Sequence, residues 1–74
     1  MGKIVLLGAR GDRETPWDPR DAKSTAAARR VFEHHSGTEF RAFEAARPGG
    51  EATLVKEFNP EAGEIVISRR LIGG

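Results

Sequence analysis

One segment of the chain opens with the run DPRD and has the composition of a helix, and short β-type segments lie on both sides of it. Asp18 is a favourable N-cap residue, Pro19 suits the first helical position, and Asp21 adds negative charge to the first turn. Gly37 is a typical residue to end such a helix. We therefore predict one helix over residues 19 to 34 or 35. A single helix among strands restricts the fold to a helix that covers one face of a sheet.

The rest of the chain contains short segments with the composition or alternation of β-strands. These segments are residues 3–7, 13–17, 39–46, 52–58 and 64–68. Glycine, proline and aspartate separate most of them and indicate turns. Pro16 places the second segment at an edge of the sheet or at a strand end, because proline cannot donate to the ladder. We expect an α+β fold with a mixed four- to five-stranded sheet packed on one long helix.

A single small core follows from the chain length of 74 residues. A domain of this size buries a little over roughly 60% of its unfolded surface, and such a core stabilises it by about 3–5 kcal/mol. We expect the core layer to consist of Ile4, Leu6, Phe32, Leu54, Ile65 and Ile67. Little room remains for a large substrate pocket with its own supporting residues, so we do not expect an enzyme.

Charge and composition exclude several classes of function. Twelve basic and eleven acidic residues give a net charge of +1, whereas nucleic-acid-binding domains carry a concentrated basic surplus. The chain has no cysteine for a thiolate site, and His34 and His35 have no evident third ligand. No apolar run approaches the roughly 20 residues of a membrane helix, and the start does not resemble a signal peptide. We predict a cytoplasmic protein without a metal or cofactor that binds neither nucleic acid nor membranes.

The order of these elements and several short motifs resemble the β-grasp fold of the ubiquitin family. KIVLLGARG is similar to the first strand and turn of that family, WDPRD to the start of its helix, and HHSG to the helix end. EATLVKEF resembles a Thr-Leu segment that precedes an aromatic residue late in the fold. EIVISRRLIGG is the closest match, with an alternating apolar strand, an arginine, a leucine, one more residue and Gly-Gly. The resemblance extends over roughly the whole chain.

This resemblance implies a protein modifier with a folded domain (residues 1–68) and a flexible diglycine tail (residues 69–74). Gly73 and Gly74 match the diglycine whose carboxylate an activating enzyme adenylates with ATP. The resemblance implies further partners: a conjugating enzyme that carries the thioester, a target protein whose amine is modified, and a deconjugating peptidase. Glycine suits this chemistry because it has no Cβ to crowd the carbonyl carbon.

The residues before the diglycine are the expected partner-binding tail, Arg69 to Ile72. Arg70 and Leu71 match the tail arginine and leucine of the family, and Arg69 adds a second guanidinium that can pair with carboxylates. Ile72 departs from the pattern, because ubiquitin has an arginine there. We therefore expect dedicated partner enzymes, and the arginine- and alanine-rich composition is similar to that of bacterial ubiquitin-like modifiers.

A possible surface patch for partners comprises Leu7, Phe43 and Ser68, where Phe43 and Ser68 take the places of an isoleucine and a valine in ubiquitin. Phe43 also has a plainer interpretation, which we favour, because large aromatic residues are usually buried in the core. The three lysines of the chain, Lys3, Lys23 and Lys56, are the only side-chain amines that can join one copy to another.

Other interpretations of the same features remain open. Two glycines at an end also occur in frayed termini, and the Arg69-Arg70 pair is equally typical of a solvated strand end. Small sulfur carriers of cofactor biosynthesis resemble this fold and end in Gly-Gly, but they form a thiocarboxylate. A β-grasp interaction module that is never conjugated is a third hypothesis, because a fold alone does not define a function.

Overall fold

The computed structural model describes residues 1–8, 11–35 and 40–69. Within these residues it contains β1 (Gly2–Leu6), β2 (Arg13–Trp17), α1 (Ala22–His34), β3 (Phe40–Ala45), β4 (Thr53–Val55) and β5 (Glu64–Arg69). In this part of the chain, no helix is long and apolar enough to cross a membrane.

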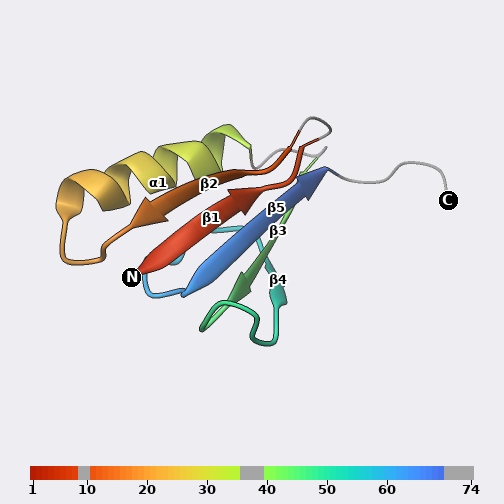
Figure 1. The fold of residues 1–74 in the computed structure, drawn as a ribbon. Coiled ribbons are helices and arrows are strands. Elements are labelled where there is room, and N and C mark those ends of the chain that lie inside the picture. Colours follow the sequence, from red (N-terminus) through yellow and green to blue (C-terminus); the bar gives the residue numbers. More distant parts are fainter. Residues whose placement is uncertain (9–10, 36–39, 70–74) are drawn as a thin grey trace, which may run out of the picture.

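The strands of the described residues form one five-stranded sheet in the order β2-β1-β5-β3-β4. β1 and β5 pair in parallel, and the β1–β2, β3–β5 and β3–β4 pairs are antiparallel. The helix α1 crosses one face of this sheet and packs on β1 and β2 (Figure 1). This arrangement confirms the predicted α+β fold of the β-grasp, ubiquitin-like type. It also confirms that the strand with Pro16 is an edge strand.

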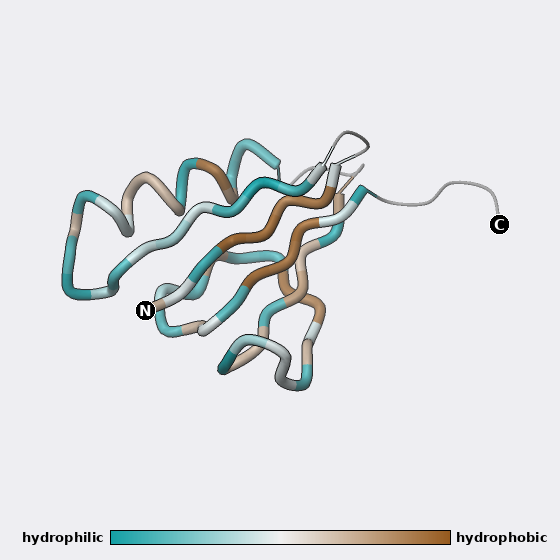
Figure 2. Tube along the Cα trace, viewed as in Figure 1, coloured by the Kyte–Doolittle hydropathy of each residue, from teal (hydrophilic) through white to brown (hydrophobic). Residues whose placement is uncertain are grey.

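The core lies between α1 and the central strands. Ile4 pairs with Ile65 and Leu6 pairs with Ile67 across the parallel ladder, and all four pack in or against the buried cluster on one face. Figure 2 shows the hydrophobic segments of β1 and β5 side by side. The helix adds Ala28 and Phe32, spaced four residues apart, to that face. The buried cluster consists of Ile4, Trp17, Ala28, Phe32, Ala42, Phe58, Ala62, Ile65 and Ile67. The predicted core members Ile4, Phe32, Ile65 and Ile67 are confirmed, and Leu6 is partly buried against them.

The prediction for the fourth strand is wrong in two respects. The strand β4 ends at Val55 rather than at residue 58, because the chain bends there and carries Phe58 into the core. Leu54, which we expected in the core, is 54% exposed, since its pairing with Phe43 places it on the other face of the sheet. Val55 instead packs against the core.

An aromatic group closes the core near the start of α1. The Trp17 side chain is 1% exposed, and its ring centroid lies 5.1 Å from that of Phe58. The Trp17 Nε1–H donates a hydrogen bond of 3.0 Å to the carbonyl of Pro60, so the one polar atom of the indole is satisfied. The guanidinium of Arg29 lies 5.4 Å from the Phe58 ring centroid and covers it from solvent.

The helix begins three residues later than predicted. Asp21, not Asp18, is the N-cap, and its side chain accepts a hydrogen bond of 3.1 Å from the Lys23 N–H. Asp18 closes a turn before the helix, where its carboxylate accepts from the Arg20 N–H and its carbonyl accepts from the Thr25 hydroxyl. Asp18 and Asp21 offer the same capping chemistry, so the sequence alone does not identify the N-cap. Contacts such as that of the Thr25 hydroxyl with the Asp18 carbonyl hold Asp18 in the turn before the helix.

Replacing Asp21 with alanine is expected to destabilise the domain by about 1 kcal/mol, because the Lys23 N–H loses its acceptor. Asp21→Asn retains an acceptor oxygen and should stay close to the original stability. Urea unfolding followed by circular dichroism measures both values. The assignment would be wrong if Asp18→Ala lowered the midpoint while Asp21→Ala left it unchanged.

Candidate functional site

The face of the sheet opposite α1, termed the outer face here, carries a row of apolar side chains. Val5 pairs with Val66, Val66 pairs with Phe43, and Phe43 pairs with Leu54, so these four residues form one line across β1, β5, β3 and β4. We call them the apolar row. Val5, Phe43 and Val66 are half-buried and Leu54 is exposed. The favoured interpretation of Phe43 as a core residue is therefore wrong, since the core lies on the opposite face.

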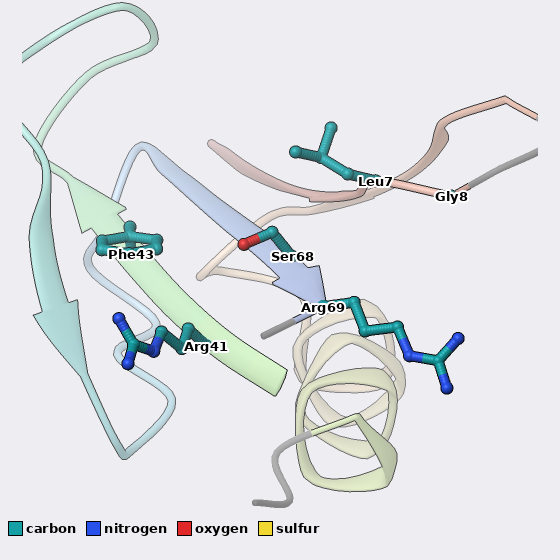
Figure 3. Close-up of a pocket in the computed structure, with 6 residues that line it drawn as sticks. All are labelled: Leu7, Gly8, Arg41, Phe43, Ser68 and Arg69. Carbon is teal, nitrogen blue, oxygen red and sulfur yellow. The ribbon is translucent and has the colours of Figure 1, made fainter. Parts of the chain in front are cut away.

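An open pocket of about 450 Å³ lies beside this row. It is lined by Leu7, Gly8, Arg41, Phe43, Ser68 and Arg69 (Figure 3). The pairing of the strands brings these residues together: Arg41 on β3 lies opposite Ser68 on β5, and the Leu7 N–H donates a 3.0 Å hydrogen bond to the Ile67 carbonyl. The three residues of the predicted patch, Leu7, Phe43 and Ser68, thus line one pocket.

The pocket combines an apolar surface with two cations. Leu7, which is 42% exposed, and the Phe43 ring lie at opposite ends of the pocket with Ser68 between them (Figure 3). Arg41 and Arg69 are both exposed, but the Arg69 side chain extends away from the other lining side chains. Apolar side chains with the Arg41 guanidinium nearby favour a ligand that carries both an apolar side chain and a carboxylate.

A second group of charges lies on the other side of the apolar row. The Lys3 ammonium is 3.3 Å from the Glu14 carboxylate and 3.8 Å from the Glu64 carboxylate. These residues connect β2, β1 and β5 on the outer face. Partly exposed pairs of this kind contribute little to stability, so their main effect is to set the pattern of charge on this face.

Only the first residue of the predicted tail is described. Arg69 is the last residue of β5, is exposed, and pairs with Phe40 of β3. The other tail residues, Arg70, Leu71, Ile72, Gly73 and Gly74, lie outside the described residues. Since β5 runs between β1 and β3, the chain leaves the centre of the sheet directly beside the pocket.

The remaining candidate residues lie apart from the pocket. Lys23 is exposed in the first turn of α1, Lys56 is exposed just after β4, and Lys3 is held by its two carboxylates. His34 ends the helix and His35 is its C-cap, where Nδ1 donates a 2.9 Å hydrogen bond to the Val31 carbonyl. Within residues 1–8, 11–35 and 40–69, no three histidine or acidic side chains form a group that can hold a metal ion.

Sequence reasoning missed several residues of the outer face. Arg41 was not singled out because a lone arginine in a strand carries no signal. Val5 and Val66 were detectable, because the runs KIVLL and EIVIS are apolar at consecutive positions, which indicates apolar residues on both faces of a strand. The alternation within a single strand could not reveal that these residues align across four strands.

The strand order and the parallel pairing of β1 and β5 give the chain a β-grasp-like fold. No family model, no curated protein and no solved structure matches the chain. The assignment of the fold therefore rests on strand order, direction and register.

Proposed function

We propose that the chain is a ubiquitin-like protein modifier whose C-terminal glycine carboxylate is activated and then joined to amines of target proteins. One observation carries the proposal: β5 ends at Arg69 beside the outer-face pocket, and the sequence continues directly with Arg-Leu-Ile-Gly-Gly. A strand fixed between two neighbours gives such a tail a rigid base.

The chemistry begins at the carboxylate of Gly74. A carboxylate oxygen attacks the α-phosphorus of ATP on the activating enzyme, and pyrophosphate leaves. An enzyme thiolate then displaces AMP and forms a thioester. A target amine attacks the thioester carbonyl, the thiolate leaves, and the nitrogen loses a proton as the amide forms. Two glycines favour these steps because no Cβ crowds the attacking atoms.

The folded body serves recognition in this proposal, and the partner enzymes supply catalysis. Leu7 and Phe43 offer apolar contact, and Arg41 and Arg69 can pair with carboxylates of an activating or conjugating enzyme. Phe43 in a surface position suits a partner with its own complementary pocket, because exposed aromatic residues are frequent anchors of interfaces.

Incubation with its activating and conjugating enzymes and ATP is expected to yield an adduct in which Gly74 is amide-linked to a lysine. Deletion of Gly74 should abolish this adduct, because the remaining terminus is one residue too short for the activating site. Peptide mass spectrometry detects the linkage, and Ala27→Ser on the exposed side of α1 is the matched control that should retain it. An adduct that persists without Gly74 would rule the proposal out.

The same experiment separates the two other functions that the fold permits. A sulfur carrier would show, after ATP and a sulfur donor, the mass gain of one sulfur-for-oxygen exchange at Gly74 and no adduct. The shared diglycine ending and β-grasp topology favour this function as the second candidate. An interaction module would retain its partner binding after deletion of Gly74.

A further inference from the structure

We propose that the outer face is also a self-association surface, on which two copies of the chain pack sheet against sheet with their apolar rows in contact. The helix α1 lies on the opposite side of the sheet, and Figure 1 shows no other helix or strand of the described residues over the outer face. The row spans four neighbouring strands, and Leu54 at its end is 54% exposed. Association of two such rows removes this apolar surface from water.

The charges on either side of the row are complementary to those of a second copy. Arg41 lies two residues from the row on one side, and Glu64 lies two residues from it on the other side. A two-fold axis along the row exchanges these sides, so Arg41 of one copy lies opposite Ala45 on β3 of the other, and Glu64 is the neighbour of that Ala45 on β5. Within the described part of the chain Arg41 makes no ion pair, and Glu64 has Lys3 at 3.8 Å. The symmetric contact supplies an acidic partner for each Arg41.

One contact in this arrangement opposes association. Glu14 pairs with Val5 at the edge of the sheet, so the axis brings the two copies of Glu14 near one another. The Lys3 ammonium at 3.3 Å partly offsets each of these carboxylates. The net charge of +1 also leaves little overall repulsion between copies.

The size of the face predicts a weak dimer. The contact area follows from four strands spaced about 4.8 Å apart and five residues along each strand at about 3.3 Å per residue. With the reach of the side chains added at the margins, the face covers roughly 500 Å² per copy. Stable complexes bury about 800 Å² per partner, so we expect a dissociation constant of about 0.1–1 mM. The dimer is therefore populated at high local concentration and hides the pocket that the proposed modifier presents to its partners.

Analytical ultracentrifugation from about 20 µM to about 1 mM tests this proposal in the range of the expected constant. The average mass should rise towards twice that of one chain, and Arg41→Glu should weaken association at least about tenfold. Arg30→Glu makes the same charge change on the exposed side of α1 and should have no effect. The pair Arg41→Glu with Glu64→Arg should restore association, because it exchanges the charges across the axis.

A mass that stays at one chain over the whole range overturns the proposal, and so does an equal effect of Arg41→Glu and Arg30→Glu. Failure of the exchanged pair to associate, in a variant that still melts cooperatively, overturns the two-fold arrangement. If that variant does not fold, Leu54→Lys replaces it and should abolish association, while Lys56→Glu nearby should not. Deletion of Gly74 should leave association unchanged, which separates this surface from the proposed conjugation chemistry.

Discussion

Replacing Trp17 with alanine is expected to leave about half of the molecules or more unfolded at room temperature. The indole is 1% exposed, packs on Phe58 and donates its N–H to the carbonyl of Pro60. Truncation of a buried tryptophan costs about 3–5 kcal/mol, which equals the roughly 3–5 kcal/mol that a core of this size supplies. Far-UV circular dichroism with a thermal scan measures the loss of the folded state.

Trp17→Phe is the matched control for this prediction. It keeps a ring against Phe58 but leaves the Pro60 carbonyl without its donor, at a cost of about 1–3 kcal/mol. A weakened but cooperative transition is therefore expected. If Trp17→Ala retains a cooperative melt within a few degrees of the original protein, the indole does not hold the core together.

Replacing Gly63 with alanine is expected to destabilise the domain by about 3 kcal/mol, although it adds only one methyl group. A Cβ at this position would lie 2.3 Å from the carbonyl oxygen of Ala46 and 2.7 Å from the Cα of Arg47. Both are backbone atoms, so no side chain can rotate away. The Gly63 N–H donates to the Ala45 carbonyl, and the Gly63 carbonyl accepts from the Lys3 N–H. A shift of Gly63 therefore disturbs the start of β5 on both sides.

Gly49→Ala is the comparison that isolates this steric effect. Gly49 has a φ of 77° but open space around its Cβ position, so alanine there costs about 1–2 kcal/mol of backbone strain. Urea denaturation of both variants should place Gly63→Ala clearly below Gly49→Ala. The reverse order would show that the approach of the two backbone segments is looser than these distances indicate.

The parts of the fold that local chemistry dictates were predictable from the sequence. Pro16 marked an edge strand, and the spacing of Ile65 and Ile67 marked one buried face of β5. The fate of Leu54 and Phe58 was not predictable, because it depends on where β4 stops. The strand β4 lies at the edge of the sheet and pairs with β3 only. It ends at Val55 because the chain then turns so that Phe58 packs in the core.

The candidate site was predictable in part for a related reason. Leu7, Phe43 and Ser68 were named from a resemblance, and they line one pocket. Arg41 was missed because its position opposite Ser68 is a property of strand register, which is set by residues far away in the sequence. The apolar row is likewise visible only after four strands have been aligned.

The parallel pairing of β1 and β5 has a mechanical consequence. Gly2 begins β1 and Arg69 ends β5, so a force that separates these two residues pulls the neighbouring strands in opposite directions along their length. The inter-strand hydrogen bonds of the pairs from Lys3–Glu64 to Leu6–Ile67 then share the load, whereas a hairpin pulled at its open end yields one bond at a time. Tension between the two ends of the domain is therefore carried in shear, the direction in which a ladder of hydrogen bonds resists most.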